Sequence, residues 1–164
     1  MKLKYISWIP AVLLMIIIFL FSAKPAVNSN ESSLSIASRI LTTYEDVADV
    51  HFSETERITK LNEINHVIRK GAHFSEYALL ANTIALHLFV LGFSKRKLYL
   101  YSVVLASFYA ATDELHQKFV EGRSGQLSDV FIDASGAVVG AFFFVLLISI
   151  VRQYRRKHQT KKHQ

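Results

Sequence analysis

The chain has 164 residues, 51% of them hydrophobic, and a formal net charge of +6. It contains no cysteine, which excludes a disulfide framework, a thiolate metal site and a cysteine nucleophile. The positive charge does not predict nucleic-acid binding, because the basic residues form no domain interleaved with exposed aromatic residues. The length predicts a single domain over residues 1–164.

Residues 5–23 form an uncharged apolar run that is about long enough to cross a bilayer as a helix. A cleaved signal peptide is the alternative, because Lys2 and Lys4 precede the run. Cleavage after Ala23 would place Phe21 where a small residue is preferred, and Pro25 follows closely. The sequence therefore favours an uncleaved membrane anchor.

Residues 24–71 form a long connection that carries apolar residues at helical spacing. The first group is Leu34, Ala37, Ile40, Leu41, Tyr44 and Val47. Ser53 to Glu56 then has the form of a capping box, and it precedes a second group of Ile58, Leu61, Ile64 and Ile68. This pattern predicts one or two short amphipathic helices on the outer surface of the bundle. A solvated, partly disordered loop is the alternative.

Three further spans are predicted at residues 72–92, 98–118 and 130–151. The apolar part of the second of these, residues 98–112, is too short to cross a bilayer, so the helix must continue into Asp113 and Glu114. The last span reaches its full length only when it includes Asp133. The sequence thus predicts an all-α membrane protein with four transmembrane helices and polar residues at membrane depth.

Basic residues indicate the orientation of these spans. Lys2 with Lys4, residues 95–97 and the tail 152–164 hold 11 of the 19 lysines and arginines and none of the 13 acidic residues. Four spans place all three segments on one side, which the positive-inside rule assigns to the cytoplasm. We therefore expect a multi-pass protein of the cell membrane with both termini in the cytoplasm.

Ionisable residues gather at the outer ends of the last three spans. Arg69, His73 and Glu76 lie three or four residues apart and share one face of a helix. Charged groups at membrane depth are costly, so they usually face the bundle interior and pair with one another. The candidate catalytic residues are His73, Glu76, Asp113 and Glu114. The candidate binding residues are Arg69, Lys70, Tyr77, His116, Gln117, Arg123, Asp129 and Asp133.

This cluster has two interpretations. It could bind an anionic head group such as a phosphate or pyrophosphate and perform acid–base chemistry on it, or it could be a polar network that holds a small bundle together. We predict no metal site, because the possible ligands His73, Glu76, Asp113 and His116 have no metalloprotease-like spacing. An ion pathway is disfavoured because the cytoplasmic halves of the spans carry almost no ionisable residues.

Two further features of the spans predict packing. Gly136 and Gly140 form a Gly-x-x-x-Gly pattern, which lets another helix approach closely. His87 lies deep in its span, away from the other ionisable residues, and is expected to make a hydrogen bond between helices.

Three ordered motifs resemble the VanZ-like family, which is named for an accessory protein of teicoplanin resistance. They are RKGAHFSEY at residues 69–77, TDELHQKFVEGRSG at residues 112–125, and Asp129 with Asp133, Gly136 and Gly140. FLFSAKP at residues 19–25 is also similar, although Lys24 stands where glutamine is more common. The resemblance covers nearly the whole chain except the middle of the outer loop and the tail.

The resemblance implies a small multi-span membrane protein of the cell envelope that contributes to glycopeptide (teicoplanin) tolerance. It gives no mechanism and leaves open whether the protein is an enzyme acting on a lipid-linked envelope precursor or a non-catalytic protein that binds membrane lipids or a partner. The residues that match the family motifs are Arg69, Lys70, His73, Glu76, Tyr77, Asp113, Glu114, Gln117, Gly122, Arg123, Asp129 and Asp133.

Overall fold

The computed structural model describes residues 2–160, and every regular element in that range is an α-helix. The helices are α1 (Lys2–Ile6), α2 (Ile9–Ser22), α3 (Ala26–Ala48), α4 (Glu54–Val90), α5 (Lys95–Gln117) and α6 (Leu127–Thr160). The predicted all-α class is therefore confirmed. Residues 161–164, the end of the predicted basic tail, lie outside the described residues.

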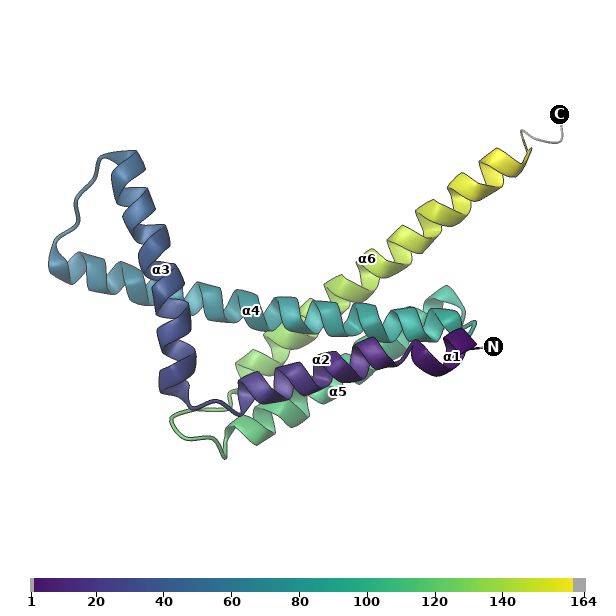
Figure 1. Cartoon of the computed structure of the whole chain (residues 1–164), viewed down its shortest axis with the longest axis horizontal. Coiled ribbons are helices and arrows are strands. Elements are labelled where there is room, and N and C mark those ends of the chain that lie inside the picture. Colours follow the sequence, from purple (N-terminus) through teal and green to yellow (C-terminus); the bar gives the residue numbers. More distant parts are fainter. Residues whose placement is uncertain (1, 161–164) are drawn as a thin grey trace.

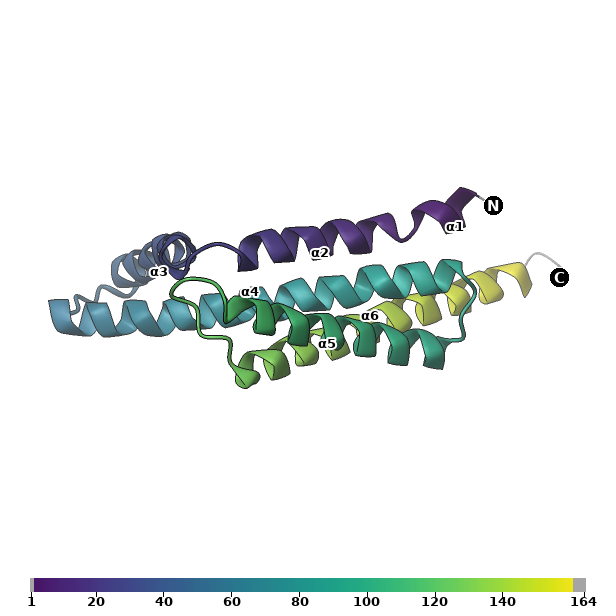
Figure 2. The same cartoon turned by 90° about the horizontal axis from the view of Figure 1, so that it is seen from below.

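Helices α4, α5 and α6 pack against one another in an elongated bundle, α2 lies along α4 and α5, and α3 lies across the first half of α4 (Figure 1). The described ends of the chain and the α4–α5 turn lie at one end of the bundle. The α2–α3 and α5–α6 connections lie toward the other end (Figure 2). The connections that follow α2 and α5 thus lie toward the end of the bundle from which α3 projects (Figure 2).

Helix boundaries follow local sequence signals. Pro10 lies in the first turn of α2, where its missing N–H costs nothing, and it explains the break between α1 and α2. Gly92, just after the end of α4, has a positive φ of 88°, which a residue with a side chain rarely adopts. The predicted capping box at α4 is confirmed: the Ser53 N–H donates to Glu56 Oε2 at 2.9 Å, and Ser53 Oγ accepts from the Glu56 N–H. The Ser53 hydroxyl also donates to Glu56 Oε2, at 2.7 Å, and this bond together with the one from the Ser53 N–H lowers the pKa of the exposed Glu56 carboxyl group.

The second predicted outer helix and the span 72–92 are parts of one continuous helix, α4. Between residues 54 and 90 the chain has no proline and one glycine, Gly71. A single glycine costs a helix only about 1 kcal/mol, so it does not end α4. The first half of α4 therefore projects from the bundle as a continuation of the second half, instead of folding over the bundle.

Helix α3 is longer than the short helix that was expected, and only part of its apolar pattern is buried. Ala37 and Leu41 are buried, whereas Ile40, Tyr44 and Val47 are exposed. Polar contacts also join α3 to α4, including an ion pair between Glu45 and Arg57 and a 2.7 Å hydrogen bond from Asn65 Nδ2 to Asn30 Oδ1.

Small residues allow the close packing of α4 against α6. A Cβ atom at Gly136 would overlap the backbone carbonyl of Phe74, and one at Gly140 would overlap that of Ala78. The predicted packing role of the glycine pair is confirmed. The expected hydrogen bond of His87 is also confirmed: its Nδ1 lies 2.9 Å from the hydroxyl oxygen of Ser7.

Two helical segments of the described chain, Leu3–Ser22 and Leu127–Arg155, are long and apolar enough to cross a membrane. The segments 72–92 and 98–118 are helical but contain more polar residues and do not meet the same criterion. Four membrane-crossing helices therefore remain a prediction.

Candidate functional site

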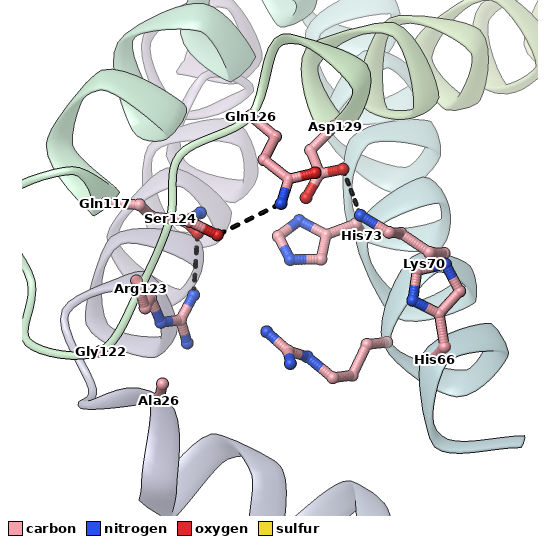
Figure 3. A pocket seen from close by; sticks show the side chains of 11 residues that line it. Ala26, His66, Lys70, His73, Gln117, Gly122, Arg123, Ser124, Gln126 and Asp129 are labelled. Atoms are coloured by element: carbon pink, nitrogen blue, oxygen red, sulfur yellow. Dashed lines mark hydrogen bonds and ion pairs between the residues drawn. The ribbon is translucent and has the colours of Figure 1, made fainter. Parts of the chain in front are cut away.

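Two adjoining cavities lie where α2, α3, α4 and the α5–α6 connection meet. The polar cavity has a volume of about 180 Å³ and is lined by Ala26, His66, Arg69, Lys70, His73, Gln117, Gly122, Arg123, Ser124, Gln126 and Asp129 (Figure 3). The wide cavity has a volume of about 450 Å³ and is lined by Phe21, Ser22, Lys24, Ser29, Ser32, Ser33, Ile36, Ile68, Arg69, Ala72, His73, Glu76 and Arg123. Arg69, His73 and Arg123 line both cavities.

The two arginines shared by the cavities have different surroundings. Arg123 donates from Nε to the carbonyl oxygen of Lys24 at 3.0 Å, from Nη2 to that of Phe21 at 3.0 Å and from Nη1 to Gln117 Oε1 at 3.1 Å. Arg69 makes no hydrogen bond or ion pair with any residue that the structure describes. Burial, together with the charge of Arg69, lowers the pKa of the Arg123 guanidinium. Two like charges that no carboxylate neutralises directly make this region attractive to an anion.

One wall of the polar cavity is closed by an ion pair between Lys70 of α4 and Asp129 of α6 (Figure 3). Beside it, Gln126 Nε2 donates to Ser124 Oγ at 3.2 Å. The pairing of Lys70 leaves Arg69 and Arg123 as the cations of this cavity that contact no carboxylate among the described residues.

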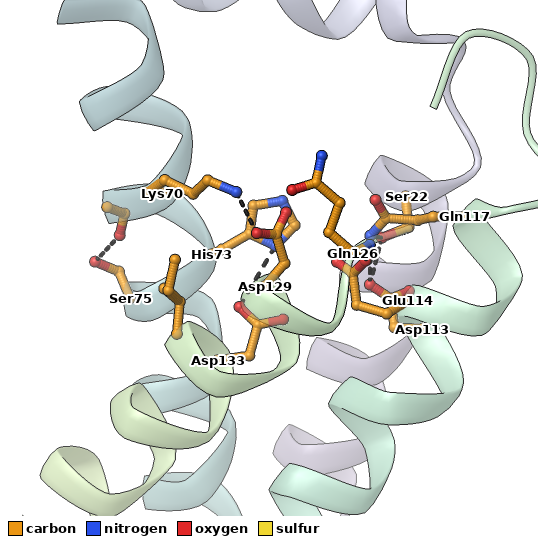
Figure 4. Close-up of polar contacts among 12 residues, drawn as sticks. Ser22, Lys70, His73, Ser75, Asp113, Glu114, Gln117, Gln126, Asp129 and Asp133 are labelled. Atoms are coloured by element: carbon orange, nitrogen blue, oxygen red, sulfur yellow. Dashed lines mark hydrogen bonds and ion pairs between the residues drawn. The ribbon is translucent and has the colours of Figure 1, made fainter. Parts of the chain in front are cut away.

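A buried network behind the cavities joins α2 to α5. Asp113 Oδ2 accepts hydrogen bonds from Ser22 Oγ at 2.7 Å and from Gln117 Nε2 at 3.0 Å (Figure 4). Gln117 in turn accepts the hydrogen bond from Arg123, so a buried carboxylate is connected to a cavity-lining guanidinium through one amide.

A second buried group brings α4, α5 and α6 together. His73 Nδ1 lies 3.5 Å from Asp133 Oδ1, and Asp133 is completely buried (Figure 4). Glu114 is also buried, and its Oε2 accepts a 3.0 Å hydrogen bond from the backbone N–H of Gln126. One nitrogen or oxygen atom from each of His73, Glu114 and Asp133 lies within 4.8 Å of the others. We name these three residues the buried trio.

The structure separates the predicted site residues into three groups. Those that line a cavity are Arg69, Lys70, His73, Glu76, Gln117, Arg123 and Asp129. Those that lie buried behind the cavity walls are Asp113, Glu114 and Asp133. The other two are Tyr77, which is fully buried in the core beside Tyr109, and His116, whose ring stacks on Phe19 at 4.7 Å between centroids.

Several cavity residues were not predicted from the sequence. His66 precedes Lys70 by one helical turn and shares its face of α4, so the same periodicity could have identified it. Ser22 binds Asp113 across 91 residues of sequence, and Gln126 contributes its backbone N–H. No sequence pattern signals either of those two contacts.

A comparison with protein families identifies a match over most of the chain. The VanZ/LLP1 family model matches residues 7–149 of the chain. The chain belongs to the VanZ/LLP1 family. Every residue that lines the two cavities of this VanZ/LLP1 protein lies within the matched region. No curated protein and no solved structure matches the chain.

Proposed function

We propose that this VanZ/LLP1 protein crosses the cell membrane four times, through α2, the second half of α4, α5 and α6. The distribution of side-chain size supports this number. Many buried positions of the bundle are occupied by small residues, including Ala81 on α4, Ala106 on α5 and Ala137 on α6. Large apolar side chains such as Leu86, Phe108 and Phe143 instead point outward on the same helices. Small residues inside and large apolar residues outside are typical of helices packed within a lipid bilayer.

The proposed orientation places the two cavities on the outer side. Lys4 of α1, residues 95–97 and Arg152 of α6 lie toward the end of the bundle opposite the cavities (Figure 2). The positive-inside rule puts that end in the cytoplasm. The basic tail then anchors the protein at the anionic inner surface.

Single cysteines test this topology, because the natural chain has none. Glu121→Cys in the α5–α6 connection and His51→Cys between α3 and α4 should react with a membrane-impermeant maleimide in intact cells. Ser94→Cys in the α4–α5 turn should react only after permeabilisation. Labelling of Ser94→Cys in intact cells, at the rate of the other two, would contradict the four-span arrangement.

We further propose that the site binds the anionic head group of a membrane lipid or lipid-linked envelope precursor. The main observation is that Arg69 and Arg123 line both cavities and contact no carboxylate among the described residues. Guanidinium groups recognise phosphate oxygens with paired hydrogen bonds. The wide cavity adds apolar wall from Ile36 and Ile68, which suits the start of a hydrocarbon chain.

His73 and Glu76 are the ionisable groups best placed for chemistry on such a ligand. Both line the wide cavity next to Arg69. A neutral imidazole accepts a proton and a protonated carboxyl group donates one, so the pair can serve a general acid–base reaction. Binding without turnover is the alternative, and in either case we assign the contribution to glycopeptide (teicoplanin) tolerance to this site.

Arg69→Gln tests the head-group proposal, because this change removes a charge without breaking a contact that the structure describes. Purified protein in neutral detergent should be stabilised against heat by phosphatidylglycerol and much less by phosphatidylcholine. Inorganic pyrophosphate in parallel separates a free anion from a lipid head group. We expect Arg69→Gln to weaken the phosphatidylglycerol effect by about ten-fold or more in half-saturating concentration, the loss of one charge-assisted contact.

The matched control is Arg39→Gln, which removes the same charge from an exposed position on α3 outside both cavities. This variant should respond to the lipid like the natural protein. In cells, Arg39→Gln should restore the teicoplanin tolerance of a deletion strain, and Arg69→Gln should not. Equal responses of the two variants would rule out the proposed role of Arg69.

A further inference from the structure

The buried trio has a geometry close to that of a metal site. Its three side chains come from three different helices, α4, α5 and α6, and their ligand atoms converge within 4.8 Å. The separation of 3.5 Å between His73 Nδ1 and Asp133 Oδ1 is about the edge of a tetrahedral site with bonds of about 2.1 Å. The Glu114 ligand atom lies within 4.8 Å of the other two, so a small movement of its side chain would complete three ligands around one ion.

The trio also contains polar atoms that lack the partners that buried groups require. His73 Nδ1, Glu114 Oε1 and both carboxylate oxygens of Asp133 make no hydrogen bond with any described residue. Asp133 is 0% exposed and Glu114 is 3% exposed, so bulk water does not solvate them. Buried polar groups are almost always hydrogen-bonded, because leaving one unpaired keeps the full cost of its desolvation. Three adjacent exceptions therefore indicate a ligand between them.

The charge of this region leads to the same conclusion. Among the described residues, no lysine or arginine forms an ion pair with Glu114 or Asp133. Lys70 is occupied by Asp129, and Arg123 donates to two backbone carbonyls and Gln117. His73, 3.5 Å from Asp133, would neutralise one of the two carboxylates, and only when it is protonated. Burying carboxylates without enough compensating positive charge is costly, and a divalent cation would neutralise both.

We infer that His73, Glu114 and Asp133 bind one divalent transition-metal ion. One imidazole with two carboxylates suits Zn²⁺, Mn²⁺ or Fe²⁺, whereas Ca²⁺ and Mg²⁺ prefer oxygen ligands alone. The hydrogen bond from the Gln126 N–H to Glu114 Oε2 would hold this carboxylate with its other oxygen toward the ion, as outer partners of metal ligands do. The possible metal ligands named from the sequence are His73 with Glu76, Asp113 and His116. Glu114 and Asp133 are not among them.

The ion would lie beside the proposed head-group site without depending on head-group binding. With the ion bound, His73 would act as a metal ligand, and Glu76 would remain the acid–base group beside Arg69. His73 lines both cavities, so an ion on this imidazole would be reached from the side where Arg69 and Arg123 lie. Three protein ligands with a remaining position open to a cavity are typical of metal sites that bind or activate a further ligand.

The test measures metal and not lipid, so it is separate from the head-group experiment. The full chain, purified in detergent with a streptavidin-binding tag, should contain about one equivalent of Zn, Mn or Fe by mass spectrometry. Removal of the ion with a chelator should lower the thermal midpoint, and readdition of ZnCl₂, MnCl₂ or ferrous salt under anaerobic conditions should restore it. Protein that neither contains nor is stabilised by any of the three ions would overturn the inference.

Two variants locate the site. Asp133→Asn keeps the shape of the side chain and should reduce the metal content at least ten-fold. Asp129→Asn makes the same change one turn earlier on α6, where the partner is Lys70, and should keep the metal. If Asp133→Asn fails to fold, Glu114→Gln replaces it, because its amide oxygen can still accept the hydrogen bond from Gln126. If the metal content is unchanged in both Asp133→Asn and Glu114→Gln, the ion is bound by other residues and the buried trio is rejected.

Discussion

Gly136→Ala is expected to be strongly destabilising for the addition of a single methyl group. The added Cβ would overlap the carbonyl group of Phe74, which belongs to the backbone of α4 and cannot move without shifting the helix. Overpacking of this kind typically costs 1–3 kcal/mol, and we expect a value near 3 kcal/mol because the obstacle is backbone. Thermal unfolding in detergent should then show a midpoint lower by roughly 6–12 °C.

Gly71→Ala is the matched control for this prediction. It makes the same change inside α4, where a Cβ would meet no atom within 4 Å. Because alanine favours a helix more than glycine does, this variant should be as stable as the natural protein or up to about 1 kcal/mol more stable. If both variants unfold at the same temperature, α4 and α6 are not in the close contact described.

The glycine pair also shows which parts of the fold are predictable from sequence. Its four-residue spacing identifies a face of α6 that must meet another helix, and the capping box at Ser53 identifies the start of α4. Both signals are local. The partner of the glycine pair is not local, because no pattern in the sequence selects the face of α4 that carries Phe74 and Ala78.

The outer helices show where periodicity is insufficient. The apolar residues of α3 recur at helical spacing, but the spacing does not say which of them face protein. Leu41 is buried, whereas Ile40 and Val47 are exposed. The predicted boundary between a second outer helix and the span 72–92 was wrong, because α4 is one continuous helix. An amphipathic segment and an apolar segment can share one helix when no proline separates them.

The sequence identifies most of the residues near the site, but it does not show which of them line a cavity. Arg69, His73 and Glu76 share a helical stripe, and the structure places all three on a cavity wall. Tyr77 and His116 were chosen by the same reasoning but lie elsewhere. Adjacent residues on a helix point about 100° apart, and here Glu76 faces the wide cavity whereas Tyr77 faces the core. Packing between helices decides which of them faces the cavity.

Arg123 combines a binding and a structural role, and Arg123→Lys is expected to separate them. The guanidinium joins the α5–α6 connection to the last turn of α2 through Phe21 and to α5 through Gln117. A lysine keeps the positive charge but cannot reach three acceptors in different directions. The free energy of unfolding should fall by about 2 kcal/mol, because several hydrogen bonds from a partly exposed charged group are lost.

The charge that Arg123→Lys retains makes a second measurement informative. If Arg123 attracts the ligand mainly through its charge, phosphatidylglycerol should still raise the thermal midpoint of Arg123→Lys from its lower starting value. Arg39→Lys, an exposed change of the same kind on α3, should alter neither quantity. A normal midpoint for Arg123→Lys without lipid would mean that its hydrogen bonds to α2 do not hold this end of the bundle together. The two cavities would then depend on the packing of α4 against α6, and the glycine pair would be the main determinant of their shape.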